Sequence, residues 1–187
     1  MKNDSVLGIE NSSEENKVLA GFWIRFGASF LDSLFLIPLS ALGFFAFIYV
    51  KDFYLYAFLT FVTFMYKPLM EGVWGATLGK MVCKIEVKDI SFQKLSFSKA
   101  IIRSIPWLFV SLSGLIEQYP LFSLGDFINA DGYLEVLLVQ DSSRTQTIVY
   151  FFQVILIVSG MFIGFKPRRG IHDFIAGSLC VYKIRNG

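Results

Sequence analysis

The chain has 187 residues, of which 55% are hydrophobic and 17% aromatic, and its mean hydropathy is +0.58. This composition is typical of a membrane protein, and the length allows one domain. The net charge of +2 argues against a nucleic-acid partner, and two cysteines, Cys83 and Cys180, are too few for a disulfide framework.

The N-terminal segment, residues 1–18, carries charged residues among Asn and Ser and contains no apolar core of a cleavable signal peptide. Such a composition is typical of a disordered or surface tail. We therefore predict a single membrane domain over residues 19–187, preceded by this tail.

Four apolar stretches predict four transmembrane helices, because a helix needs about 20 residues to cross a bilayer. The first is Ala20–Val50, which is long enough to tilt. The second is Phe53–Met70, and its Lys67 is expected to snorkel toward the membrane surface. The third is Ala100–Ile116, and the fourth, Thr145–Phe165, is free of charge throughout.

The basic residues set the expected orientation, because Lys and Arg concentrate on the cytoplasmic side of membrane proteins. Lys80–Arg103 and Lys166–Gly187 are both basic, whereas Glu117–Arg144 is acidic. The first two segments are therefore expected in the cytoplasm and the third outside the cell. With four spans, both chain termini are then cytoplasmic.

Two short segments outside the spans have an imperfect alternating pattern that predicts β-strands, Met81–Lys88 and Leu179–Lys183. If they pair at the cytoplasmic face, Cys83 and Cys180 lie near one another and stay reduced in the cell. Amphipathic segments without strand pairing are the alternative. The predicted fold class is an all-α integral membrane protein with four spans and this short addition.

Two further segments mix polar and apolar residues outside the expected spans. Phe92–Ile105 begins polar and becomes apolar, as expected of an interfacial helix that leads into a span. Leu121–Leu138 predicts an interfacial helix or a re-entrant piece, because its apolar runs are too short for a fifth span.

Arg25 and Asp32 are the only charged residues from Phe22 to Val50, and a charge inside a bilayer costs roughly a few kcal/mol. On a helix they share a face but lie about 10 Å apart along the axis, too far for a direct ion pair. Each needs a partner from another segment, unless Arg25 snorkels and Asp32 serves only assembly. The candidate partners are Glu71, Lys80, Arg103, His172 and Asp173.

Other motifs carry weaker signals. His172 beside Asp173 is either a proton-handling pair or an interfacial histidine next to a capping aspartate, and we favour the second. The patterns Gly75–Gly79 and Gly160–Gly164 predict close helix packing. One histidine and two distant cysteines form no zinc signature, and no nucleophile or phosphate-loop motif is present. We therefore expect no metal, no cofactor and no enzyme activity.

Three motifs follow one another in a fixed order along the chain: Ala20–Asp32, Gly75–Asp89 and Arg169–Gly177, with Arg103 before the last. This ordered set resembles the RDD family of prokaryotic membrane proteins, which is named for one arginine and two aspartates. The resemblance extends over about Ala20–Lys183, nearly the whole chain.

The resemblance implies that Arg25 is the named arginine and that Asp32 and Asp173 are the two aspartates. It also implies a polytopic protein of the cell inner membrane. The sequence departs from the family at Lys84, where a glycine is common, and in a long acidic stretch between spans three and four.

The resemblance implies little chemistry, although cation/proton antiport has been suggested for some members. In a first hypothesis the protein transports a small cation or proton as an oligomer. Asp32 is then the ion-binding carboxylate, and Arg25 and Asp173 form a charge network supported by Lys80, Arg103 and His172. In a second hypothesis the charged residues are structural, and the protein is an assembly or regulatory module that binds another membrane protein.

Overall fold

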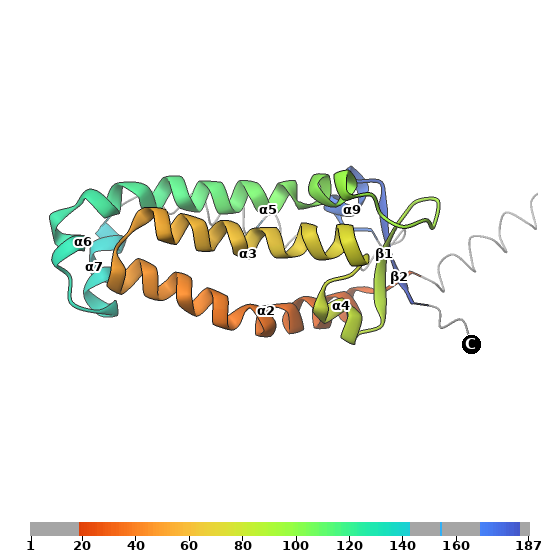
Figure 1. Cartoon of the computed structure of the whole chain (residues 1–187), viewed down its shortest axis with the longest axis horizontal. Helices are drawn as coiled ribbons and strands as arrows, with labels where there is room; N and C mark the ends of the chain where they lie inside the picture. Colours follow the sequence, from red (N-terminus) through yellow and green to blue (C-terminus); the bar gives the residue numbers. More distant parts are fainter. Residues whose placement is uncertain (1–18, 143–153, 155–168, 184–187) are drawn as a thin grey trace, which may run out of the picture.

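The computed structural model describes residues 19–142, 154 and 169–183. Three long helices lie side by side along the molecule: α2 is Phe22–Phe45, α3 is Phe53–Trp74 and α5 is Phe97–Gln118 (Figure 1). Helix α2 continues into a π-helical turn, η1, at Ala46–Val50, and α5 continues into a 3-10 turn, η2, at Tyr119–Ser123.

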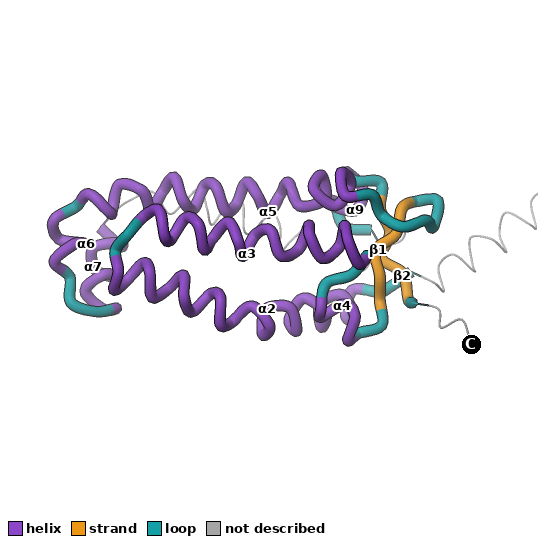
Figure 2. Tube along the Cα trace, viewed as in Figure 1, coloured by secondary structure: helices purple, strands orange, loops and turns teal. Residues whose placement is uncertain are grey.

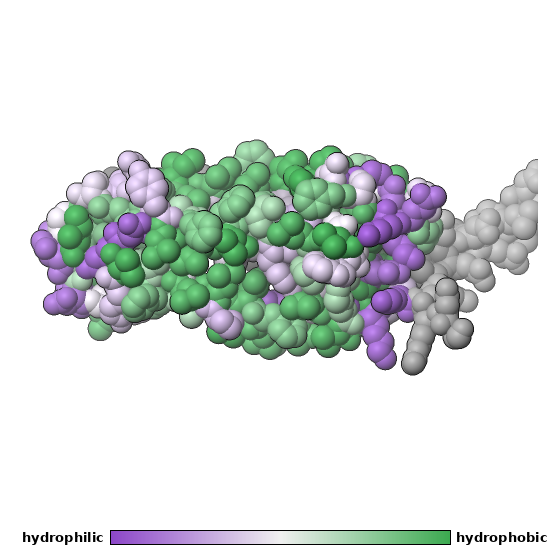
Figure 3. Space-filling view, in the orientation of Figure 1, coloured by the Kyte–Doolittle hydropathy of each residue, from purple (hydrophilic) through white to green (hydrophobic). Residues whose placement is uncertain are grey.

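All three helices are long and apolar enough to cross a membrane, over Phe22–Val50, Phe53–Trp74 and Phe97–Ser123. Their large apolar side chains are exposed, for example Phe30 and Phe58, and an apolar surface of this extent suits lipid rather than water. Figure 3 shows this surface in the middle of the molecule, with hydrophilic side chains at both ends. These helices correspond to the first three predicted spans.

The fourth predicted span, Thr145–Phe165, lies outside the described residues, apart from Val154. So do the N-terminal tail, residues 1–18, and the glycine pair Gly160–Gly164.

A two-stranded antiparallel sheet closes one end of the helix bundle (Figure 2). Strand β1, Ile85–Asp89, pairs with β2, Ser178–Tyr182, in the register that places Val87 opposite Cys180. The predicted pairing is therefore present, but the expected strand began too early. Met81 belongs to a short helix, α4, at Leu78–Val82. The side of the membrane on which the sheet lies remains a prediction.

The turn between α4 and β1 places Lys84 at φ +55°, in the left-handed region that favours glycine. The departure of this sequence from the RDD pattern at that residue thus falls on a backbone position that glycine adopts more easily. Cys180 lies in an apolar cluster against which Cys83 packs, so the predicted proximity of the two free cysteines is confirmed.

The opposite end of the bundle carries two further short helices, α6 at Gly125–Asn129 and α7 at Tyr133–Ser142 (Figure 1). Together with η2 they occupy the segment expected as an interfacial or re-entrant piece. An apolar cluster holds them against the ends of α2 and α3; its buried members are Phe47, Ile48, Leu121, Phe127, Ala130 and Val136. Lys51 adds hydrogen bonds to the carbonyls of Ile128 and Ala130, at 2.8 and 2.6 Å.

The expected interfacial helix over Phe92–Ile105 is absent as a separate element. Helix α5 begins at Phe97, because Ser96 is its N-cap and accepts a hydrogen bond from the Lys99 amide. The helix then continues without interruption into the span. Pro106 lies inside α5 without ending it.

Candidate functional site: a buried charge cluster beside a cavity

Five buried charged side chains meet where α2, α3, α4 and α5 reach the sheet and the short helix α9, Ile171–Ile175. None of the five residues is more than 7% exposed. We call this group the charge cluster; its members are Arg25, Glu71, Lys80, Arg103 and Asp173.

Asp173 joins two helices through its carboxylate. Its Oδ2 accepts a hydrogen bond from Arg25 Nη1 at 2.5 Å, and its Oδ1 lies 2.8 Å from Arg103 Nη2. The same Oδ2 accepts the backbone N–H of Gly170 at 3.2 Å, which fixes the start of α9. A residue far along the chain therefore forms ion pairs with the arginines of both α2 and α5.

Glu71 continues the cluster from α3. Its carboxylate pairs with Lys80 of α4, and its Oε2 lies 3.3 Å from Arg103 Nε. Arg103 is thus shared between Glu71 and Asp173. The cluster contains three cations and two carboxylates in a continuous chain of ion pairs, an arrangement that offsets the cost of burying each charge.

Hydrogen bonds to the backbone and to a serine hydroxyl attach the cluster to the sheet. Arg25 donates to the carbonyls of Ala20 and Cys180, at 3.1 and 3.4 Å, and Arg103 donates to the Ser178 hydroxyl at 3.4 Å. Because Cys180 and Ser178 belong to β2, the two arginines fix the sheet against the helix ends. The cluster therefore has a clear structural role.

Burial and the charges of the cluster shift the pKa values of two residues of α9, Asp173 and His172. Burial alone raises the pKa of Asp173, but the guanidinium groups of Arg103 and Arg25 outweigh it and hold that pKa far below its usual range. Burial, together with the neighbouring cations, lowers the pKa of His172 to about 3. At neutral pH the contact of 3.4 Å between His172 Nε2 and Asp173 Oδ1 is therefore one between a neutral imidazole and a carboxylate.

Asp32 lies outside the charge cluster. Its Oδ1 accepts hydrogen bonds from the Tyr66 hydroxyl at 2.8 Å and the Gly79 amide at 2.7 Å, and its Oδ2 accepts from the Thr77 hydroxyl at 2.6 Å. We call this group the Asp32 site. The prediction that Asp32 converges with Arg25 and Asp173 was therefore wrong. Because Arg25 and Asp32 lie about two turns apart on α2, their side chains contact different partners.

Gly79 explains how α4 comes close enough to reach Asp32. A Cβ atom at this position would collide with the Ala28 carbonyl and approach the Asp32 amide to 2.8 Å. The expected close packing is thus real at Gly79, but it does not involve a glycine pair on one helix. Gly75 ends α3 at φ +74°, with the left-handed backbone of a C-cap.

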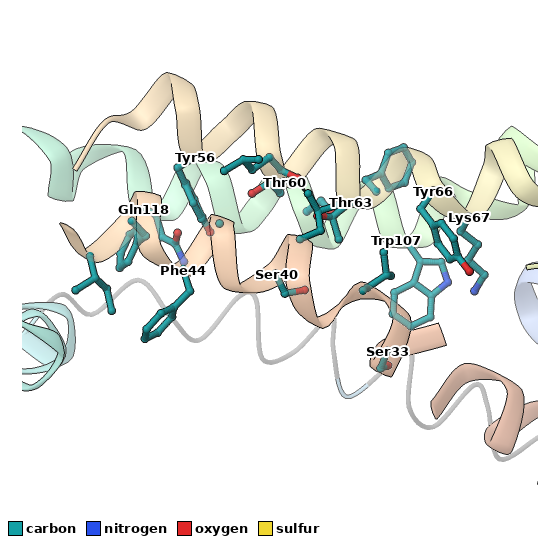
Figure 4. Close-up of a pocket in the computed structure, with 18 of the residues that line it drawn as sticks. Ser33, Ser40, Phe44, Tyr56, Thr60, Thr63, Tyr66, Lys67, Trp107 and Gln118 are labelled. Atoms are coloured by element: carbon teal, nitrogen blue, oxygen red, sulfur yellow. Dashed lines mark hydrogen bonds between the residues drawn. The ribbon is translucent and has the colours of Figure 1, made fainter. Parts of the chain in front are cut away.

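A cavity of about 690 Å³ opens between α2, α3, α5 and α7, and Asp32 lines one end of it. Figure 4 shows Tyr66, Lys67 and Trp107 gathered at this end, and Phe44, Tyr56 and Gln118 at the other. Lys67 does not simply point outward as expected. Its ammonium lies 5.0 Å from the centre of the Trp107 ring, a cation–π contact.

Hydroxyl groups from three helices line the cavity between its ends. Ser33, Thr63 and Ser104 each donate to a carbonyl one turn earlier in their own helix, at 3.1, 2.8 and 3.0 Å. Because the hydroxyl protons are used within the helices, their oxygen lone pairs are left to accept from a bound group. The cavity wall is thus rich in acceptors.

Sequence reasoning named Arg25, Lys80, Arg103 and Asp173, and the structure brings these together. It named Glu71 only as a candidate partner and missed Tyr66, Thr77 and the orientation of Lys67. Lys67 lies in the second predicted span, and Glu71 lies one helical turn further, just past its predicted end. The intramembrane-charge signal applied to Arg25 and Asp32 could have found Lys67, and a longer span, as observed for α3, would have included Glu71.

Three apolar helices of spanning length, closed at one end by a buried charge cluster, define an α-helical membrane protein. The match to the RDD family profile extends over residues 19–177, and the chain belongs to this family. No curated protein and no solved structure matches the chain.

Proposed function

We propose that this protein is a membrane transporter of the cation/proton exchange type, and that Asp32 is the carboxylate that receives the cation or proton. The observation that carries the proposal is the position of Asp32 at the end of a cavity inside an apolar helix bundle. Placing a carboxylate inside an apolar helix bundle costs free energy, and this cost favours a functional role for Asp32. The acceptor-rich wall formed by Ser33, Thr63 and Ser104 supports the passage of a positively charged group.

In this proposal the charge cluster has a structural role, whereas Arg25 and Asp173 were expected to form part of the transport network. These two residues hold the sheet and α9 against the helices, and they keep the cytoplasmic end of the cavity closed. Lys80 and Arg103 belong to the same closure. His172, neutral near pH 7, is a packing residue of α9 rather than a proton carrier.

The topology of the proposal follows from charge. Four spans in the cell inner membrane place both termini and the sheet end in the cytoplasm, and place α6 and α7 outside. A bundle of four helices is narrow, so the transporter works as an oligomer. The proposed protein is not an enzyme, since its sequence carries no nucleophile or metal-ligand motif.

A second candidate is an assembly or regulatory module, and the completeness of the charge cluster favours it. Each of its five side chains contacts an opposite charge within the cluster, which supports a structural role. The acidic outer end offers a docking surface for another membrane protein, since Asp126, Asp131 and Glu135 are exposed there. Under this reading Asp32 also serves assembly alone.

A proteoliposome flux assay with a pH-sensitive dye separates the two functions. Gradients of Na⁺, K⁺ and Li⁺ are applied to the native protein and to Asp32→Asn. Transport predicts cation-dependent proton movement that Asp32→Asn abolishes while the protein stays folded. No flux from the folded native protein, with a reduced yield of folded Asp32→Asn, supports the assembly module instead.

A further inference from the structure

We propose that the charged end of the cavity binds a zwitterion, with its ammonium group at Asp32 and its anionic group at Lys67. The inference names a substrate class for the proposed transporter and rests on its assignment of Asp32 as the cation-binding group. Binding can be measured without flux, so the two proposals can fail separately.

The argument begins with which charges in this part of the molecule lack an opposite charge. Every cation of the charge cluster contacts a carboxylate of the cluster. Among the described residues, Lys67 forms no ion pair with a carboxylate, and its ammonium group lies over the face of Trp107. Asp32 likewise has no cationic partner in the described part of the chain, since its donors are two hydroxyls and a backbone amide.

The two unneutralised charges line the same cavity from different helices, Asp32 from α2 and Lys67 from α3. In the described part of the chain they form no ion pair with each other, and the nearby carboxylate of Glu71, one turn from Lys67 on α3, is already paired with Lys80 and Arg103. A purely cationic ligand would satisfy Asp32 and be repelled by Lys67, and an anionic ligand would meet the opposite problem. A ligand that carries both charges satisfies both side chains at once.

The surroundings fit the two ends of such a ligand. Trp107 and Ser104 of α5 line the cavity, and its apolar lining includes Leu36, Leu39, Leu59 and Phe64. An apolar substituent attached to the zwitterion can bury itself against them. Two sources provide this chemistry: a free α-amino acid with an apolar side chain, and the phosphoethanolamine headgroup of a phospholipid.

Three ligands of nearly equal shape test the charge requirement. Leucine carries both charges, leucinol lacks the carboxylate, and 4-methylpentanoate lacks the ammonium group. Titration calorimetry uses the full-length protein in nanodiscs of phosphatidylglycerol, whose headgroup has no ammonium. We expect leucine to bind at least about ten-fold more tightly than either analogue, because each charged contact is worth a factor of this size.

Matched variants assign each charge to its side chain. Lys67→Met should remove the preference for leucine over leucinol, and Asp32→Asn should remove the preference for leucine over 4-methylpentanoate. Lys94→Met is the control, since Lys94 is an exposed lysine outside the cavity, and it should bind all three ligands as the native protein does. If Asp32→Asn does not fold, the Lys67→Met comparison alone decides the result.

A second arm distinguishes the two sources. Native mass spectrometry after purification from membranes that contain phosphatidylethanolamine shows whether this lipid is retained. Retention by the native protein and loss by Lys67→Met, with no leucine preference, assigns the site to the lipid headgroup. Leucine preference without lipid retention assigns it to the free zwitterion. The proposal is overturned if the native protein shows neither, or if Lys67→Met matches the native protein in both arms.

The flux assay tests the proposed transport function separately from the binding of a zwitterion. Leucine binding without cation-dependent proton flux removes the transporter and leaves the zwitterion site. Proton flux without a preference for leucine or retention of the lipid removes the zwitterion site and leaves the transporter.

Discussion

The charge cluster is buried and the Asp32 site is half-buried, and the two sites near the sheet end of the bundle differ in which groups contact their carboxylates. In the cluster, Glu71 and Asp173 meet cations directly. At the Asp32 site the carboxylate meets only neutral donors and faces a cavity. Removing one partner of a buried ion pair leaves an uncompensated charge and destabilises the fold, whereas a carboxylate with only neutral partners remains available to a cationic ligand.

The largest effect is expected from breaking the cluster. Glu71→Gln leaves Lys80 buried without its carboxylate and should lower the free energy of unfolding by about 3–5 kcal/mol. Thermal unfolding in detergent measures the change. The matched control is Glu86→Gln, whose partner Lys88 lies at the partly exposed sheet surface, and which should cost about 0–1 kcal/mol. Equal losses for the two variants would contradict a structural role of the cluster.

A substitution at Gly79 tests the Asp32 site rather than the charge cluster. Gly79→Ala places a methyl group against the Ala28 carbonyl, so α4 must move away from α2. We expect a loss of about 1–3 kcal/mol in unfolding free energy, typical of overpacking, together with weaker ligand binding at Asp32.

Gly114→Ala is the control for this change, because nothing lies within 4 Å of the added methyl group. Ligand binding unchanged in Gly79→Ala would show that the close approach of α4 does not position Asp32.

His172, which contacts the charge cluster, makes the stability of the protein depend on pH. The folded protein binds fewer protons than the unfolded chain between pH 6.5 and about 3, because the pKa of His172 is lowered to about 3. Stability should therefore fall as the pH falls through this window, by about 2 kcal/mol between about pH 7.5 and pH 5.

Unfolding temperatures of the native protein and His172→Gln, measured at both pH values, test this. The variant should lose most of the difference. Asp173 should contribute none of it, because both pH values lie above the ordinary aspartate pKa of about 3.9, so its carboxylate is ionised in the folded and in the unfolded chain. A native protein equally stable at both pH values would contradict the burial of a neutral histidine.

The smallest effect is expected at Lys84, which belongs to neither group. Its φ of +55° strains a side chain that glycine lacks. Lys84→Gly should stabilise the protein by about 0.5–1 kcal/mol, the relief of left-handed strain less the added chain entropy. Denaturant midpoints of the two proteins measure the gain, and a loss of stability would show that the lysine side chain contributes a contact.

Much of the fold could be predicted from hydropathy, because spans and strand pairing follow local patterns. The charge partners could not, since Arg25 and Asp32 share a helix face and periodicity alone does not say which distant side chain reaches each one. Asp173 reaches Arg25 only because β2 and α9 fold back onto α2. Thr77 and Tyr66 carried no charge signal at all, and only the close approach at Gly79 brings α4 to Asp32.

Comparing Asp32→Asn with Asp173→Asn tests the central claim, that the two RDD aspartates have different roles. Both variants exchange a carboxylate for an amide, and the measurement is proton flux per folded molecule in the same proteoliposomes, with folded protein quantified by gel filtration. We predict that Asp173→Asn lowers the folded fraction while the molecules that do fold retain flux. Asp32→Asn should fold in full and show no flux. Loss of folding in Asp32→Asn, or loss of flux per folded molecule in Asp173→Asn, would contradict the account.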